Sequence, residues 1–159
     1  MYHSAQLSEL TDLWCSGSPP QPQAAPFASD PVGPGATSPL RVLIVEDEVM
    51  IAMTLESMIE DFGYEVCAIA NTGEDAVGQA LIAKPDVILM DINLGRGIDG
   101  IEAARLTRQS FGARIVFVTA YCDASTLARV RSAAPDAAVL NKPFDSTGLL
   151  EAIQRTASH

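Results

Sequence analysis

From Leu40 onward, short apolar runs alternate with stretches in which apolar residues recur at helical spacing. The apolar runs lie at residues 42–45, 66–70, 87–90, 114–119 and 137–140. Their short length and continuous apolar character predict strands buried on both faces, because a half-exposed strand would alternate apolar and polar residues. The pattern therefore predicts five buried strands.

Helical patterns lie between and after these strands, at residues 51–62, 72–81, 101–111, 123–130 and 149–153. Gly63 stops the first pattern, as glycine often does after a helix. Thr72 followed by Asp75 has the form of a capping box, and Asp123 is placed to cap the fourth helix. Five strands alternating with five helices predict an α/β fold, a doubly wound parallel sheet with helices on both faces.

In such a sheet, ligands bind beyond the carboxyl ends of the strands. The polar residues at these ends are Glu46, Asp47 and Glu48 after the first run, Asp91 after the third, Thr119 in the fourth, and Asn141 and Lys142 after the fifth. If the first and third strands are neighbours, three carboxylates converge. Two like charges at about 4 Å repel by about 4 kcal/mol at an effective dielectric of about 20.

A divalent cation would remove this repulsion, and a ligand set made only of oxygens favours Mg²⁺. Lys142 adds a positive charge and Thr119 a hydroxyl at the same edge of the sheet. Carboxylates, a hard metal, a lysine and a hydroxyl together predict a site that handles a phosphoryl group.

Composition narrows the functions further. The chain has 10 Lys and Arg against 20 Asp and Glu, a net charge of −10, so direct nucleic-acid binding is not expected. It contains neither an apolar run of the ~20 residues that a bilayer requires nor the features of a signal peptide, so no membrane insertion and a cytoplasmic location are expected. The three cysteines lack metal-ligand spacing and are expected to be reduced thiols.

Residues 1–39 differ from the rest of the chain. They contain seven of the ten prolines and no Lys or Arg, which predicts a disordered, proline-rich leader ahead of a domain at residues 40–159. Leu7, Leu10 and Trp14 share one helical stripe. This stripe is open to three interpretations: a docking helix, a marginal helix on a tail, or a start codon assigned too far upstream.

Four motifs in order, "LIVEDE", "VILMDINL", "FVTAY" and "LNKPF", resemble the receiver domain of two-component response regulators. The resemblance extends from Leu40 to the C-terminus. It implies the flavodoxin-like (βα)5 fold with strand order 2-1-3-4-5. It also implies that Asp91 accepts a phosphoryl group from a sensor histidine kinase or a histidine phosphotransferase.

The same resemblance implies roles for the other strand-end residues. Asp47 and Asp91 would bind Mg²⁺ directly with the backbone carbonyl of Asn93, and Glu46 would act through a metal-bound water. Lys142 would pair with a phosphoryl oxygen, with a cis peptide bond before Pro143. Thr119 would donate its hydroxyl to the acyl phosphate.

The resemblance fails at one position that receivers use for readout. Receivers commonly carry Tyr or Phe three residues before the lysine, where this chain has Val139, a short side chain that is stiff at χ1. Tyr121 lies two residues after Thr119. We therefore predict that switching runs through the loop from Thr119 to Asp123, with Tyr121 also affecting hydrolysis of the acyl phosphate.

A competing motif lies in the same region, because Gly95, Gly97 and Gly100 have the G-x-G-x-x-G spacing of a dinucleotide-binding turn. Such a turn places its first glycine directly at the strand end. Here four residues, 91–94, intervene and the first of them is an acid. We expect instead that the glycines let the loop turn away from Asp91.

The function expected from the sequence is that of a response regulator without an output domain, acting through an unknown protein target and open to homodimer formation. It is not expected to be an enzyme beyond slow self-dephosphorylation. One alternative is a pseudo-receiver that binds partners without phosphorylation. A less favoured one is a Mg²⁺-dependent phosphohydrolase with an aspartyl phosphate, since Asn93 stands where such enzymes carry a second acid.

Overall fold

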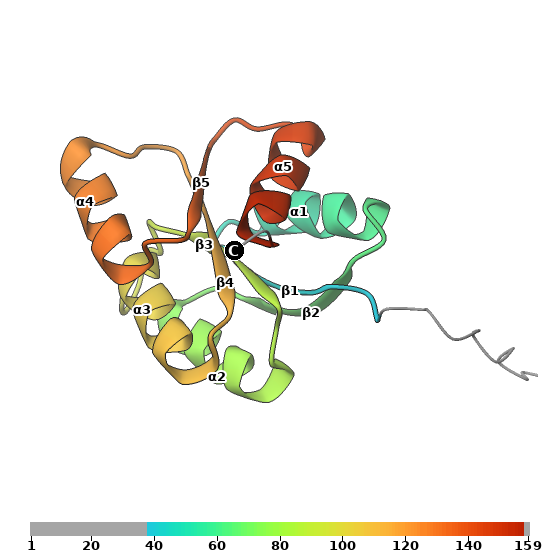
Figure 1. The fold of residues 1–159 in the computed structure, drawn as a ribbon, viewed down its shortest axis with the longest axis horizontal. Helices are drawn as coiled ribbons and strands as arrows, with labels where there is room; N and C mark the ends of the chain where they lie inside the picture. Colours follow the sequence, from blue (N-terminus) through green and yellow to red (C-terminus); the bar gives the residue numbers. More distant parts are fainter. Residues whose placement is uncertain (1–37, 158–159) are drawn as a thin grey trace, which may run out of the picture. The chain divides into compact units, whose positions relative to one another are not determined.

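The structure, a computed structural model, describes residues 38–157, so the predictions for the leader, including Leu7, Leu10 and Trp14, lie outside the described residues. The strands are β1 (Arg41–Val45), β2 (Glu65–Ala70), β3 (Val87–Asp91), β4 (Arg114–Thr119) and β5 (Ala138–Asn141). The helices are α1 (Val49–Asp61), α2 (Gly73–Ala83), α3 (Gly100–Phe111), α4 (Ala124–Ala133) and α5 (Ser146–Ala157). The elements alternate in chain order, as predicted (Figure 1).

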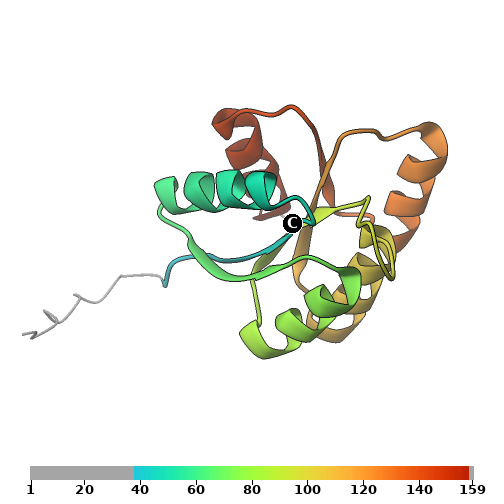
Figure 2. The same cartoon turned by 180° about the vertical axis from the view of Figure 1, so that it is seen from behind.

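The five strands form one parallel sheet in the order β2-β1-β3-β4-β5, which confirms the predicted fold class and strand order. Helices α1 and α5 cover one face, and α2, α3 and α4 cover the other (Figures 1 and 2). The buried apolar residues accordingly form two clusters. Leu55 and Ile153 belong to the cluster on the α1 and α5 face, and Ala104 and Val130 to the cluster on the opposite face.

The sheet register brings the first and third strands together, as the site requires. Val45 is paired with Met90 across β1 and β3, and Asp91 is paired with Val118 across β3 and β4. All five residues of β3 are buried, because this strand lies in the middle of the sheet with helices on both sides. The acids after β1 and at the end of β3 therefore lie at the same edge.

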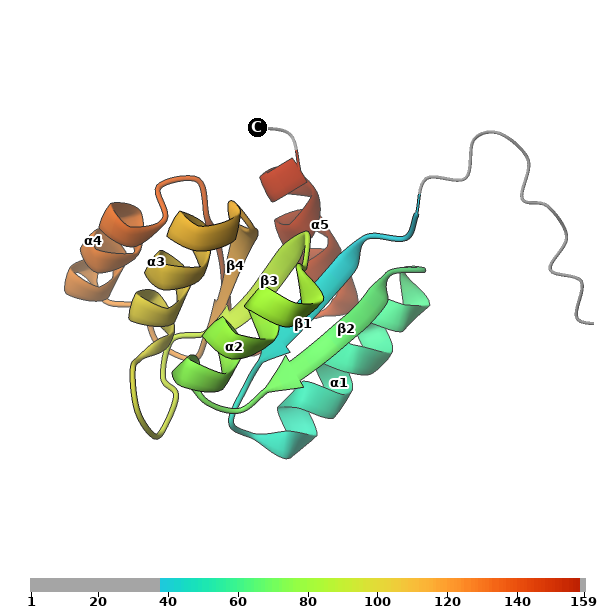
Figure 3. The ribbon, with the colours of Figure 1, turned by 90° about the horizontal axis from the view of Figure 1, so that it is seen from below.

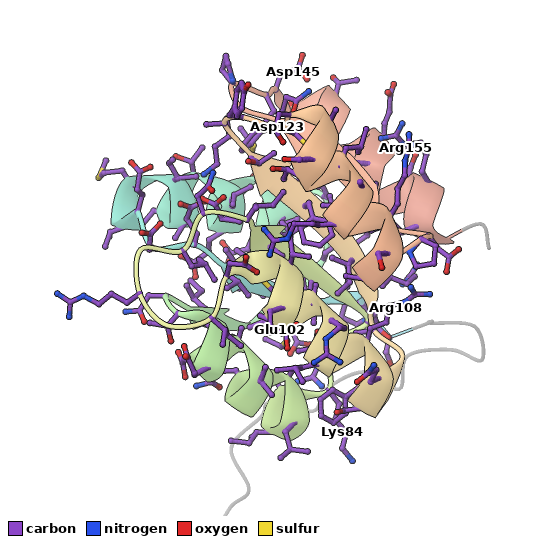
Figure 4. The ribbon with its side chains drawn as sticks, turned by 90° about the vertical axis from the view of Figure 1, so that its left-hand side faces the viewer. Lys84, Glu102, Arg108, Asp123, Asp145 and Arg155 are labelled. Atoms are coloured by element: carbon purple, nitrogen blue, oxygen red, sulfur yellow. The ribbon has the colours of Figure 1, made fainter. Side chains whose placement is uncertain are left out.

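Side-chain caps start several helices where the sequence predicted them. The Thr72 hydroxyl accepts a hydrogen bond from the Asp75 N–H at 3.2 Å, and the Asp123 carboxylate accepts one from the Thr126 N–H at 2.7 Å. Each satisfies a backbone donor in the first turn that has no partner within the helix. Figure 4 shows Asp123 in the upper part of the view, near Asp145, and Lys84 at the bottom.

Two further observations concern the cysteines and the length of the helices. Cys67 and Cys122, the cysteines within the described range, are free thiols. Among residues 38–157, no helix has the length and apolar character needed to cross a membrane.

Candidate functional site

Three carboxylates meet at the carboxyl ends of β1 and β3. Glu46, Asp47 and Asp91 each offer an oxygen, and these oxygens all lie within 4.8 Å of one another. Glu46 and Asp91 are buried, whereas Asp47 is exposed and open to a ligand from solvent. The convergence predicted from the strand ends is therefore present in the fold.

Lys142 joins this cluster from the loop that follows β5. Its Nζ donates hydrogen bonds to Glu46 Oε2 at 2.8 Å and to Asp91 Oδ2 at 2.9 Å. Its backbone N–H donates to the carbonyl of Thr119 at 2.7 Å, which ties the loop to the end of β4. The peptide bond between Lys142 and Pro143 is cis.

Burial and charge act in opposite directions on the ionisation of these groups. Burial is the larger cause at Glu46 and raises the pKa of its carboxyl, although the hydrogen bond from Lys142 opposes this. Burial would lower the pKa of Lys142, but its hydrogen bonds to Glu46 and Asp91 outweigh that effect and raise it. One ammonium group faces three carboxylates, so the cluster retains an excess of negative charge that a cation would neutralise.

Thr119 ends β4 beside this cluster and is fully buried. Its hydroxyl donates a hydrogen bond to the Tyr121 carbonyl at 3.0 Å and accepts a longer one from the Tyr121 N–H at 3.4 Å. In this structure the hydroxyl is thus turned to the following loop. The Tyr121 residue itself is 71% exposed, and Val139 packs partly buried against the core.

The loop between β3 and α3 borders the cluster on its other side. The Asn93 N–H donates to Asp91 Oδ1 at 3.1 Å, and the Gly95 N–H donates to Asp47 Oδ2 at 3.2 Å. The Gly95 N–H is the first backbone donor that a bound pyrophosphate would need, and it is already bonded to Asp47. This arrangement disfavours the dinucleotide interpretation.

Gly97 and Gly100 have different roles, which corrects the expectation that all three loop glycines turn the loop. Gly97 is in the left-handed region with φ +76°, which suits a turn. Gly100 instead begins α3 directly against the backbone of Asp91, where a Cβ would overlap the Asp91 carbonyl oxygen. Its N–H donates to the Ile92 carbonyl at 3.1 Å. Gly100 is required by close packing, a constraint that the sequence spacing alone does not reveal.

The donor set fits a hard divalent cation. Asp47 and Asp91 offer carboxylate oxygens, the backbone carbonyl of Asn93 lies in the bordering loop, and Glu46 is near enough to act through a water. The excess negative charge of the cluster favours such an ion. Sequence reasoning gave Lys142 a role toward the phosphoryl group but missed its ion pair with Glu46, since these two residues are 96 positions apart.

An exposed apolar patch lies beside the carboxylates. Val49, Met50 and Met53 on the first turns of α1 are 70%, 75% and 57% exposed, and Ile69 of β2 is 41% exposed. We call these four residues the α1 patch. Asp47, Val49, Met53 and Ile69 line one shallow pocket, so the patch is continuous with the site. Helical periodicity did not predict it, because it lies outside the helix face that packs on the sheet.

Comparison with known proteins gives consistent matches. The family model for the response regulator receiver domain matches residues 42–154. The chain is 40% identical over 123 residues to the transcriptional regulatory protein PdtaR of Mycobacterium tuberculosis, covering 77% of this chain and 59% of that protein. It is 32% identical over 119 residues to the chemotaxis protein CheY of Thermotoga maritima, covering 74% of this chain and 97% of that protein. The chain thus spans little more than half the length of PdtaR but nearly all of CheY.

Solved structures agree with these matches. The signal receiver domain of a modulated diguanylate cyclase from Desulfovibrio desulfuricans superposes with a TM-score of 0.70 at 34% identity, covering 75% of this chain and 94% of that one. The receiver domain of PhyR from Erythrobacter litoralis gives a TM-score of 0.68 at 30% identity, covering 77% and 93%. With the family model matching most of the chain, and with a similar fold in both structures, this protein belongs to the response regulator receiver domain family.

Proposed function

We propose that this protein is a phosphoacceptor of two-component signalling in the cytoplasm, in which Asp91 takes a phosphoryl group from a phosphohistidine donor. The observation that carries the proposal is the environment of the Asp91 carboxylate. It is buried, bonded to Lys142 Nζ at 2.9 Å, and within 4.8 Å of the ligand oxygens of Glu46 and Asp47. A carboxylate is a weak nucleophile, so catalysis must come from positioning and charge neutralisation.

The transfer forms one bond and breaks one. An oxygen of the Asp91 carboxylate attacks phosphorus, the P–N bond to the donor imidazole breaks, and that nitrogen keeps the electron pair and takes a proton from solvent. Mg²⁺, held by Asp47, Asp91 and the Asn93 carbonyl with Glu46 acting through a water, would neutralise charge on the transferred group.

The remaining groups each exchange a hydrogen-bond partner. Lys142 gives up Asp91 Oδ2 and pairs with a phosphoryl oxygen, while its bond to Glu46 keeps the ammonium in position. The Thr119 hydroxyl leaves the Tyr121 carbonyl and donates to the acyl phosphate. These exchanges link phosphorylation to movement of the loop that follows β4.

The partners that we propose are proteins: a sensor histidine kinase or histidine phosphotransferase as donor, and a downstream protein target. The net charge of −10 supports protein partners over nucleic acid. The α1 patch supports docking of the donor, because it places an exposed apolar surface next to the carboxylates. We propose no enzymatic turnover beyond slow hydrolysis of the protein's own acyl phosphate.

The test uses acetyl phosphate and Mg²⁺ with intact-mass measurement. The native protein should gain the mass of one phosphoryl group, and Asp91→Asn should gain none. Asp61→Asn, which changes an exposed acid at the end of α1, is the matched control and should be labelled like the native protein. Equal labelling of Asp91→Asn and native protein would refute the assignment, and a native protein that accepts phosphate from no donor would favour the pseudo-receiver alternative.

A further inference from the structure

The loop between β3 and α3, residues 92–99, is anchored by a side chain that lies outside the carboxylate cluster. Glu74, in the first turn of α2, accepts a hydrogen bond from the Ile98 N–H through Oε1 at 2.9 Å. The residues are 24 positions apart, and Figure 3 shows α2 beside the loop that leaves β3. A charged side chain of one helix thus holds the backbone of the loop that carries Asn93.

Two glycines make this contact sterically feasible. A Cβ at Gly97 would overlap the Glu74 carboxylate, and Gly97 also has a φ of +76°. A Cβ at Gly73 would overlap the side chain and carbonyl of Ile98. The start of α2 and the loop therefore fit together only because both sides lack a side chain at the point of closest approach.

The anchor differs from its neighbours in its relation to the metal. Among the described residues, four side chains from outside the loop bond to it. Asp91 bonds to the Asn93 N–H, Asp47 to the Gly95 N–H, Glu74 to the Ile98 N–H, and Arg129 to the Asp99 carboxylate. A cation bound through Asp47 Oδ2 would compete with the Gly95 N–H for that oxygen. Asp91, which bonds to the Asn93 N–H, is itself a proposed cation ligand. Among the described residues, Glu74 is therefore the carboxylate outside the loop that holds the loop backbone without also being proposed to bind the cation.

We propose that Glu74 is a positioning residue for the cation site. It fixes the loop so that the Asn93 carbonyl stays directed at Mg²⁺ after Asp47 has released Gly95. The proposal rests on the proposed function for its significance. The proposal itself concerns structure: removing the Glu74 acceptor should speed amide exchange at Ile98 and weaken Mg²⁺ binding.

If Glu74 only stabilised the start of α2, Glu74→Ala and Asp75→Ala would have the same effect. Glu74 and Asp75 are both acids in the first turn of α2, and both interact favourably with the helix dipole. Only Glu74 bonds to the loop. Asp75→Ala therefore removes the same charge from the same helix turn and serves as the matched control for Glu74→Ala.

The experiment measures Mg²⁺ affinity by NMR titration, and amide exchange at Ile98, in the full chain. In Glu74→Ala the Mg²⁺ dissociation constant should rise about fivefold and Ile98 should exchange about tenfold faster, as expected for loss of one charge-assisted hydrogen bond. Asp75→Ala should stay within about twofold on both measurements. Glu74→Gln keeps an oxygen acceptor and should restore most of the native behaviour.

A double-mutant cycle provides a second, independent readout. Gly97→Ala should weaken Mg²⁺ binding in the native background, because its Cβ overlaps the Glu74 carboxylate. The same change should weaken binding less in a Glu74→Ala background, where the overlap is gone and only the backbone strain remains. Additive effects would overturn the proposal. So would equal behaviour of Glu74→Ala and Asp75→Ala, or a failure of Glu74→Gln to restore binding.

These measurements separate the two proposals. Both readouts are made without phosphoryl donor, so they judge the Glu74 anchor by itself. A native protein that binds Mg²⁺ but is not labelled at Asp91 by acetyl phosphate would refute the proposed function and leave the anchor standing. Labelling at Asp91 with an unchanged Ile98 amide in Glu74→Ala would refute the anchor alone.

Discussion

Strand β3 and helix α4 pack in opposite ways. Every residue of β3 is buried, including Asp91, whereas α4, whose ten residues all lie in the described range, buries only Val130. The neighbouring strand β5 is also thinly covered, since all four of its residues keep some exposure. Asp91, the proposed phosphoacceptor, thus lies in the part of the sheet that is hardest to deform, and the side of the molecule beyond β4 can shift at lower cost.

The composition of the two regions explains this difference. Val87–Met90 is a continuous apolar run between two other apolar strands, so both of its faces find partners. Helix α4 is rich in Ala, Ser and Arg and has few large apolar residues to bury. Part of its attachment is electrostatic, through Arg129 to Asp99 at the start of α3. The loop that follows Thr119, which borders this region, can therefore shift at lower cost than Asp91.

The largest effect should come from removing a side chain from the firmly packed centre of the sheet, and a much smaller one from removing an apolar side chain from α4. Phe117 of β4 is fully buried, and Phe117→Ala should lower the free energy of unfolding by about 3–5 kcal/mol. Leu127 of α4 is only partly buried, so Leu127→Ala should lower it by about 1 kcal/mol or less. Urea unfolding of both variants tests this. Similar losses would mean that α4 is packed as firmly as the core.

The next largest effect should come from changing an acid of the proposed cation site. Asp47→Asn should weaken Mg²⁺ binding by at least about tenfold, because a direct carboxylate ligand becomes neutral. Glu48→Gln should change it by less than about twofold, since Glu48 is exposed and lies outside the carboxylate cluster. Calorimetry or NMR is required, because the only tryptophan, Trp14, lies in the leader. A large effect at Glu48 with none at Asp47 would show that the acid cluster is misassigned by one residue.

Sequence patterns predicted the positions of the strands, the caps at Thr72 and Asp123, and the meeting of Asp47 with Asp91. These features follow from local periodicity and from the rule that parallel strands end at one edge. The prediction that all five strands are buried was wrong for β2 and β5, because these edge strands have a neighbouring strand on one side only and keep exposed residues. The fifth strand was shifted by one residue, because the pairing of Asn141 with Thr119 extends it beyond its apolar run.

Other features could not be predicted because they depend on contacts between distant segments. The Lys142 to Glu46 bond, the packing of Gly100 on Asp91 and the α1 patch all arise only when the elements pack. The same spacing of glycines can indicate a turn or the close packing of two backbone segments. Only the structure separates Gly97, which has a positive φ, from Gly100, which packs against the Asp91 backbone.

A smaller effect should follow from removing the ion pair that holds α4. Arg129→Gln should lower the free energy of unfolding by less than about 1 kcal/mol, because both partners are partly exposed to solvent. Arg131→Gln, an exposed arginine on the same helix, is the control and should have no measurable effect.

The Arg129 effect should depend on pH in a defined direction. Burial would raise the pKa of Asp99, but hydrogen bonds from Arg129 and the Glu102 N–H outweigh it and lower the pKa below its usual value of 3.8. A lowered folded-state pKa gives stability that is present above the unfolded value and lost as pH falls through the folded one. The difference between native protein and Arg129→Gln should therefore be full at pH 7 and shrink below about pH 4. A difference that persists unchanged in strong acid would contradict this account.

The smallest effect that we predict lies at Tyr121, in the loop between the carboxylate site and the loosely packed helix α4. Val139, which takes the place of the usual ring, packs partly buried in the core and is too short and stiff to report by rotation. Tyr121 bonds through its backbone to the Thr119 hydroxyl, so a Thr119 that turns to the acyl phosphate must release the Tyr121 backbone. Its side chain is exposed, and we expect it to alter water access to Asp91 when the loop moves.

We therefore expect Tyr121→Ala to change the lifetime of the acyl phosphate by about twofold, the scale set by surface substitutions worth about 0.5 kcal/mol. It should also reduce the NMR shift changes along α4 that beryllofluoride binding produces in the native protein. Cys122→Ala, one residue further along the same loop, is the control and should leave both measurements near native. If Tyr121→Ala alters neither the lifetime nor the α4 shifts, the ring only covers the loop. The hydrogen bonds between the Thr119 hydroxyl and the Tyr121 backbone would then be the whole connection between Asp91, the proposed phosphoacceptor, and the loosely packed helix α4.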